Sequence, residues 1–180
     1  MEPLLEVSNL TKVFGTLPVL NGISFSVNAG EVIGLAGGSG SGKSVLAMLL
    51  AGLDTPTSGQ IHFEGKRFLW PIHAHKLGIE VIHQTPVLVD SQDVTSNIFL
   101  GSELGWPPNL GWFRIPDWRR MDYETKQILD TLDLTGISLR EKVSNLSSEQ
   151  RQMIAVGRVM TRPVKLLIVD EPMTLLRYSY

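Results

Sequence analysis

The stretch Gly37-Gly38-Ser39-Gly40-Ser41-Gly42-Lys43-Ser44 decides the fold, because it matches the pattern GxxxxGK[ST] at every fixed position. Glycines at this spacing let the backbone curl so that its N–H groups point inward at phosphate oxygens. Lys43 supplies a positive charge to the β- and γ-phosphates of a nucleotide, and the Ser44 hydroxyl is a ligand for Mg²⁺. The octapeptide therefore predicts a phosphate-binding loop.

The residues on either side of this loop are those that its structural context requires. Residues 31–36, before the loop, form a short apolar run that predicts a strand buried on both faces. Residues 43–51, after it, predict a helix whose positive dipole end adds to the phosphate site. The alternative, a flexible Gly/Ser loop that matches by chance, does not explain this order. Kinases, GTPases and motor proteins all remain open at this stage.

A second apolar run ends in acids: Leu166-Leu167-Ile168-Val169-Asp170-Glu171-Pro172. We expect a buried parallel strand here, with Asp170 holding Mg²⁺ directly or through water. Glu171 points the other way along the strand and is placed to polarise the attacking water as a general base. The alternative is an ordinary strand end with solvated acids. Lys43 and Glu171 are thus predicted catalytic residues.

The remaining pattern predicts an α/β fold: a P-loop NTPase core with an N-terminal antiparallel β subdomain and an inserted α-helical subdomain. In the first strand, Leu5, Val7 and Asn9 are expected on one face. We expect residues 1–180 to form a single domain, with residues 1–84 and 161–180 as the α/β core and residues 85–160 as a helical part without strands. The expected strands are 4–12, 19–27, 60–63 paired with 67–69, and 79–83; the expected helices in the helical part are 96–100, 118–134 and 146–160.

Composition excludes several classes of protein. The 180 residues carry a formal net charge of −2, which argues against a nucleic-acid-binding surface. The chain has no cysteine, so disulfides and cysteine-ligated metals are excluded. No segment reaches the about 18 apolar residues that span a bilayer, and the N-terminus does not resemble a signal peptide. We therefore expect a cytoplasmic protein that reaches a membrane only through a partner.

The segment Leu146-Ser147-Ser148-Glu149-Gln150, about 20 residues before Asp170, resembles the LSGGQ signature of the ABC ATPase family. The order of aromatic residue, P-loop, glutamine, signature and acidic strand is also the order of that family. The resemblance implies that Phe14 stacks on adenine, that nucleotide binding extends from residue 37 to Val45, and that Gln84 is catalytic. It also implies Mg²⁺ ligation by Ser44, Gln84 and Asp170. The stretches 77–84, 94–101 and 146–153 are most similar to the ATPases of ribose, xylose and galactose importers.

For function, the resemblance implies ATP hydrolysis that energises the import of a solute such as a sugar, with ATP and Mg²⁺ as cofactors. It implies a second ABC ATPase domain as a head-to-tail partner, whose ATP the signature residues 146–150 contact in trans. It further implies membrane permease subunits and a location on the inner face of the cell membrane. Two alternatives stay open: a nucleotide-binding module with little hydrolysis of its own, and a non-transport ABC ATPase.

The signature has a purely structural interpretation as well. Ser147 followed three residues later by Gln150 is a capping box that any helix can use, with Met153, Val156, Gly157 and Met160 as a core stripe.

The sequence also departs from the family pattern. Ser148 and Glu149 replace two glycines, and a carboxylate about 4–5 Å from a γ-phosphate would cost roughly 3–4 kcal/mol at an effective dielectric near 20. Glu149 turned toward solvent is the alternative. Val45 replaces a threonine, which removes one hydroxyl contact to the α-phosphate. The chain ends at Tyr180, before the strand that carries the family's switch histidine. We therefore expect a domain truncated after its acidic strand, with little hydrolysis by the chain alone.

Overall fold

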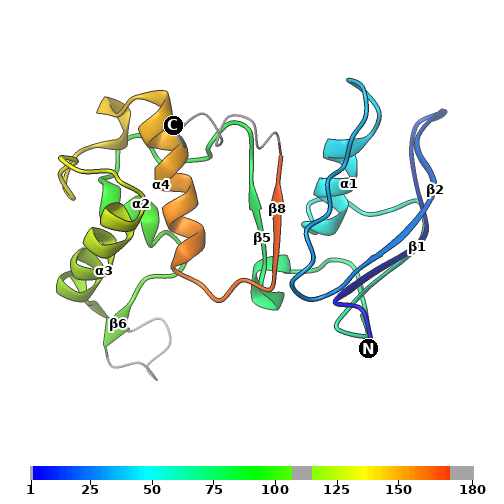
Figure 1. Ribbon diagram of the computed structural model, residues 1–180, viewed down its shortest axis with the longest axis horizontal. Helices are drawn as coiled ribbons and strands as arrows, with labels where there is room; N and C mark the ends of the chain where they lie inside the picture. The colour runs from blue at the N-terminus through cyan, green and yellow to red at the C-terminus, as the bar shows by residue number, and fades with distance from the viewer. Residues whose placement is uncertain (1, 107–114, 171–180) are drawn as a thin grey trace. The chain divides into compact units, whose positions relative to one another are not determined.

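The computed structural model describes residues 2–106 and 115–170 (Figure 1). The described residues form two compact units, one made of residues 2–81 and 165–170 and the other lying within residues 82–164. Within the described residues, no helix has the length and apolar character to cross a bilayer.

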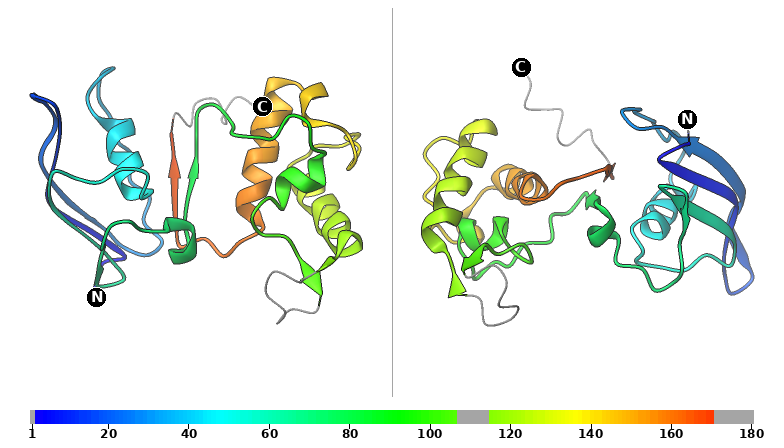
Figure 2. Two further views of the ribbon diagram at one scale, coloured as in Figure 1. Left: turned by 180° about the vertical axis from the view of Figure 1, so that it is seen from behind. Right: turned by 90° about the horizontal axis from the view of Figure 1, so that it is seen from below.

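The first unit contains a four-stranded sheet in the order β2-β1-β3-β4. All its pairings are antiparallel, which confirms the predicted antiparallel β subdomain. Figure 2 shows the sheet twisting alongside helix α1 of the same unit. The strands are β1 Leu5–Phe14, β2 Leu17–Val27, β3 Ser58–Phe63 and β4 Lys66–Arg67, and α1 spans Lys43–Leu50.

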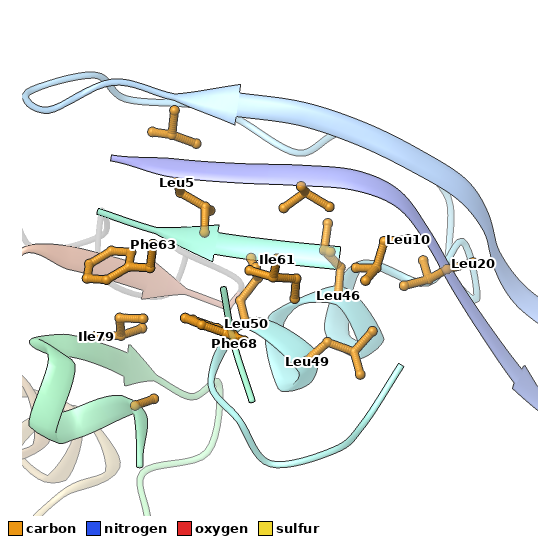
Figure 3. Close-up of a cluster of buried hydrophobic side chains, with 13 residues drawn as sticks. Leu5, Leu10, Leu20, Leu46, Leu49, Leu50, Ile61, Phe63, Phe68 and Ile79 are labelled. Atoms are coloured by element: carbon orange, nitrogen blue, oxygen red, sulfur yellow. The ribbon is translucent and has the colours of Figure 1, made fainter. Parts of the chain in front are cut away.

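The core of the first unit lies between this sheet and α1 (Figure 3). Leu5, Val7 and Leu10 of β1 are buried against the apolar side of α1. The expectation that Asn9 shares this face was wrong. Asn9 has φ 50° and its amide donates to Ser24 Oγ, so the register shifts and Leu10 continues the buried face. The α1 residues in this core are Leu46, Leu49 and Leu50.

The strand predicted at residues 31–36 is absent from the described sheets. Its side chains lie open to solvent, with Val32 96% and Leu35 53% exposed. An apolar, β-prone run becomes a strand only when a neighbouring strand accepts and donates its hydrogen bonds. No described strand pairs with residues 31–36, so local sequence preference alone was insufficient.

Strands β5 (Ile79–Ile82) and β8 (Leu166–Val169) form a separate two-stranded sheet. A short 3₁₀ turn, η1 (Ala74–Leu77), precedes β5. The amides of Lys165 and Leu166 both donate to the Gly78 carbonyl, at 2.8 and 3.1 Å, and Figure 1 shows both strands starting from that end. The two strands were predicted, but full burial of β8 was wrong. Leu167 is 45% exposed, so its face of the described two-stranded sheet is not fully covered.

The second unit is mainly helical, with a core shared by three helices. Gly157 of α4 meets this core closely, since an added Cβ would lie 2.9 Å from Ile128 Cγ2. A short hairpin, β6 with β7, corrects the expectation that this part contains no strand. The elements are α2 Val94–Ile98, β6 Gly105–Trp106, β7 Ile115–Pro116, α3 Trp118–Thr131, η3 Val143–Asn145 and α4 Ser148–Met160.

The expected core stripe of α4 was only partly right. Gly157 is buried, but Met160 is 45% exposed and the other buried positions are Gln152 and Ile154. Gln152 is buried because its Nε2 donates to the His83 carbonyl at 3.3 Å, which satisfies the polar amide.

Hydrogen bonds and ion pairs from arginines connect the loops of the second unit to its helices. Arg140 donates to Asp93 Oδ2 at 3.0 Å and to Asp122 Oδ2 at 2.6 Å, while Asp93 Oδ1 caps α2. From α4, Arg158 donates to the carbonyls of Val87 and Asn97, both at 2.9 Å. These are charge-assisted bonds, which are stronger than bonds between neutral groups.

Candidate nucleotide-binding site

The loop between residues 37 and 44 can form its curve only with glycine at key positions. Gly40 has φ 78° and Gly42 has φ 89°. Gly42 is the N-cap of α1, and a Cβ added there would lie 2.8 Å from Leu20 Cδ2 and 2.9 Å from the Val19 carbonyl oxygen. A larger residue at Gly42 therefore meets both a strained backbone and the β2 strand.

The Lys43 side chain folds back over this loop. Its Nζ donates to the carbonyl oxygens of Gly37 at 2.7 Å and Gly38 at 2.9 Å, and to Ser41 Oγ at 3.3 Å. Residues 37–41 are exposed, so the ammonium group lies in a loop that a solvent-borne anion can reach. The structure thus brings the Lys43 ammonium group and the loop backbone together.

Backbone N–H groups of this loop are available to an anion. The Ser41 amide donates to the Gly38 carbonyl at 3.3 Å. In the part of the chain that the structure describes, no protein acceptor takes the amide hydrogens of Ser39, Gly40, Gly42, Lys43 or Ser44. Backbone donors without a protein acceptor at the start of a helix fit a phosphate group.

The predicted Mg²⁺ ligands have suitable chemistry. Ser44 is exposed in the first turn of α1, and Asp170 is partly buried directly after β8; both belong to the first unit. Hydroxyl and carboxylate oxygens are donors that Mg²⁺ takes together with phosphate oxygens. Gln84 lies two residues after β5 and is exposed in the second unit. Glu171, the expected general base, lies outside the described residues.

Phe14, the expected adenine-stacking residue, ends β1 with 47% of its side chain exposed. The ammonium of Lys12 lies 4.8 Å from the centroid of the Phe14 ring. Sequence reasoning missed Lys12; the available signal was its position two residues before Phe14, on the same side of a strand. Val45 is partly buried and packs against the core of the first unit, so its methyl groups serve the packing of α1.

The signature residues form the start of α4. Ser147 is the N-cap: its Oγ accepts from the Gln150 amide at 3.2 Å, and its own amide donates to Gln150 Oε1 at 2.9 Å. The capping box is therefore present. Leu146 packs against the core of the second unit, whereas Ser148 and Glu149 are exposed. Glu149 points to solvent within the first helical turn, where the helix dipole favours a negative charge.

A contact that sequence reasoning missed supports this helix start. Arg151 donates to Asp90 Oδ1 at 2.6 Å and to the Val143 carbonyl at 3.0 Å. Asp90 is 61 residues away in the sequence, so no local pattern indicates the pair.

Comparisons with known proteins show which family the chain resembles. The profile of the family described as ABC transporter matches residues 20–174. The xylose/arabinose import ATP-binding protein of Sulfolobus acidocaldarius is 37% identical, with 96% of this chain and 67% of that protein covered. The fructose import ATP-binding protein of Rhizobium meliloti is 35% identical, with 95% and 67% covered. The ribose import ATP-binding protein of Caldanaerobacter subterraneus is 33% identical, with 96% and 34% covered.

Solved structures give the same result. An ATP-binding cassette of an ABC transporter aligns with a TM-score of 0.78 at 29% identity, covering 96% of this chain and 70% of that one. CbiO1 from Clostridium perfringens, part of an ABC transporter complex, aligns with a TM-score of 0.75 at 26% identity, covering 97% and 67%. The chain therefore belongs to the ABC transporter family, whose ATP-binding proteins are ATPases coupled to transport.

Proposed function

We propose that this chain binds Mg·ATP at residues 37–44 and hydrolyses it as part of an assembly that imports a solute, most simply a sugar. The observation that carries the proposal is the loop around Lys43, where five backbone amides reach no acceptor in the described residues and an ammonium group lies among exposed carbonyls. The sugar assignment rests on the relatives, whose names are those of xylose/arabinose, fructose and ribose import ATP-binding proteins.

Each proposed site residue has a role that its chemical type permits. Lys43 and the loop amides bind the β- and γ-phosphates, and Phe14 stacks on the base. Ser44 and Asp170 would hold Mg²⁺, which would neutralise charge on the phosphates; Gln84 as a further ligand rests on the family resemblance alone. Glu171 accepts the proton of the attacking water, and Gln84 helps to orient that water.

We infer a head-to-tail partner that is a second ABC ATPase domain, and membrane permease subunits that this pair drives. The chain then works on the cytoplasmic face of the membrane. Support for the partner comes from the exposure of Ser147, Ser148 and Glu149 at the start of α4, where a phosphate from another domain can approach. Support for the permease comes from the relatives' names as import ATP-binding proteins.

A second candidate, a nucleotide-binding module with little hydrolysis of its own, is favoured by a specific observation. Ser147 Oγ and the Gln150 amide already satisfy each other in the capping box. Glu149, beside them, repels an incoming γ-phosphate. Both features weaken a site formed by the P-loop of one domain and the signature of another, and they leave the P-loop itself unaffected.

Calorimetric titration with Mg·ATP tests the proposal. We expect the full chain to bind, and Lys43→Ala to weaken binding about 100-fold or more, because at least two charge-assisted bonds to phosphate are lost. Lys165→Ala is the matched control, since Lys165 forms an exposed ion pair with Glu64 in the same unit. Folded protein that takes up no Mg·ATP, or a Lys43→Ala variant that binds normally, contradicts the proposal.

Turnover separates the two candidates. In the assembled transporter, Glu171→Gln should keep Mg·ATP binding and lose about 10²–10⁴-fold in rate, the usual contribution of a general base. Unmodified protein that binds Mg·ATP but shows no turnover in that assembly supports the non-hydrolysing module instead.

A further inference from the structure

Lys12 is an unusual side chain for its position in β1, because it is charged and only 9% exposed. Its Nζ donates to Asp54 Oδ1 at 2.7 Å and to the Thr55 carbonyl at 2.7 Å. The third neighbour of the same Nζ is the Phe14 ring, 4.8 Å from its centroid. A buried ammonium is costly unless its donors are satisfied, and here two oxygens and a ring face surround it. Its position is therefore fixed.

Asp54 keeps its negative charge for this pair. The hydrogen bond from Lys12, followed by the bond from the Thr55 amide, holds the pKa of the Asp54 carboxyl below its ordinary value of 3.8. Two more hydrogen bonds join the same segments: the Thr57 amide donates to the Thr11 carbonyl at 2.8 Å, and the Val13 amide donates to Thr57 Oγ1 at 3.0 Å. The end of β1 is thus attached to residues 54–57.

Residues 54–57 also follow closely after α1, which ends at Leu50 and begins at the phosphate loop. One short helix therefore separates the proposed phosphate-binding end from the segment that holds Lys12. All these residues belong to the first unit.

We propose that Lys12 is a positioning residue for the base of the bound nucleotide, acting through Phe14. The ammonium fixes the ring on one face and draws π-electron density toward itself, so the ring's exposed surface becomes a better stacking partner for an electron-rich purine. The inference rests on the proposed function, in which Phe14 stacks on adenine. It predicts that Lys12 affects recognition of the base and leaves recognition of the phosphates unchanged.

The test measures binding of Mg·ATP and of Mg·tripolyphosphate, which has no base, by calorimetry on the full chain. Lys12→Met keeps the aliphatic stem and removes the charge. We expect Mg·ATP affinity to fall about 3- to 10-fold, since a cation–π contact of about 1 kcal/mol corresponds to roughly a fivefold change. Tripolyphosphate affinity should not change. Lys12→Arg, which keeps the charge and can stack on the ring, should restore ATP binding.

A double-mutant cycle separates positioning from general support of the fold. In a Phe14→Ala background, Lys12→Met should have no further effect on Mg·ATP affinity. The cycle also tests whether Lys12 acts through Phe14 if tripolyphosphate binds too weakly to measure. Lys12→Gln supplies a second neutral variant if Lys12→Met fails to fold, because its amide remains a hydrogen-bond donor. Lys165→Met is the control for loss of an exposed lysine.

Three results overturn the inference: equal losses for ATP and tripolyphosphate, unchanged ATP affinity in Lys12→Met, or an undiminished effect of Lys12→Met without the Phe14 ring. Each differs from failure of the proposed function, in which the unmodified chain binds neither Mg·ATP nor tripolyphosphate.

Discussion

Two helices of this chain begin at proposed phosphate contacts, and their first turns are built differently. α1 has Gly42 as its N-cap and no side-chain cap, so its first amides reach no acceptor in the described residues. α4 has Ser147 as its N-cap, with both bonds of a capping box formed. A satisfied N-terminus stabilises its own helix, whereas an unsatisfied one keeps donors for a ligand. Under the proposed function, the first amides of α1 can bind a phosphate without losing a protein partner, whereas Ser147 and Gln150 must first exchange their internal bonds.

The largest expected effect is a loss of stability at the start of α1. Gly42→Ala should lower the free energy of unfolding by about 2–4 kcal/mol, because the new Cβ meets Leu20 and the Val19 carbonyl at a backbone with φ 89°. Mg·ATP affinity should fall with it. Urea denaturation and calorimetry measure the two effects. Gly38→Ala is the control, since an added Cβ there meets nothing within 4 Å; equal losses in both variants would refute the explanation.

On the α4 side, Ser147→Ala should lower the stability of the second unit by about 1 kcal/mol, the usual effect of losing a cap. Binding of Mg·ATP by the isolated chain should stay unchanged if, as proposed, the signature contacts the nucleotide of a partner. Hydrogen exchange of the first α4 amides is the measurement. Exposed Ser148 gives the matched variant Ser148→Ala, which should change little. Weakened ATP binding in Ser147→Ala would show that the two helix ends are not independent.

A smaller loss of stability is expected when the Arg151 contacts near the start of α4 are removed. Arg151→Met should cost about 1 kcal/mol, because it removes bonds to both Asp90 and the Val143 carbonyl. Asp90→Asn should cost about 0.5 kcal/mol or less, because Asp90 is 64% exposed and water screens the pair. Thermal unfolding compares the two variants. Equal losses would assign the whole effect to the ion pair.

The smallest expected effect depends on pH. Burial raises the pKa of Asp93, but hydrogen bonds from Ser96 and the ion pair with Arg140 outweigh it, so the pKa lies below its ordinary value of 3.8. A carboxyl with a lowered pKa stabilises the fold above that value, and the contribution disappears as the pH falls through the folded-state pKa. Urea denaturation from pH 6 downward should show this loss, which Arg140→Met should reduce by about 0.5 kcal/mol. An identical pH dependence in the variant would exclude the pair as its source.

Sequence reasoning succeeded where residues close in the chain determine the structure. The turn of residues 37–44 and the Ser147–Gln150 capping box depend on neighbours a few positions away, and both are present. It failed where distant partners decide. Residues 31–36 lack a partner strand among the described residues, and the Lys12–Asp54 pair joins positions 42 residues apart. Glu171 lies outside the described residues, so its role stays a prediction.

Two arginines, one in α4 and one just after its end, limit the movement of the chain around them. Arg158 donates hydrogen bonds to the carbonyls of Val87 and Asn97, and Arg162 donates one to that of Leu100 at 3.1 Å. Because these three bonded carbonyls are spread over residues 87–100, this stretch has little freedom to shift along α4. We therefore expect α4 and residues 87–100 to move as one piece, because hydrogen bonds at three carbonyls join them.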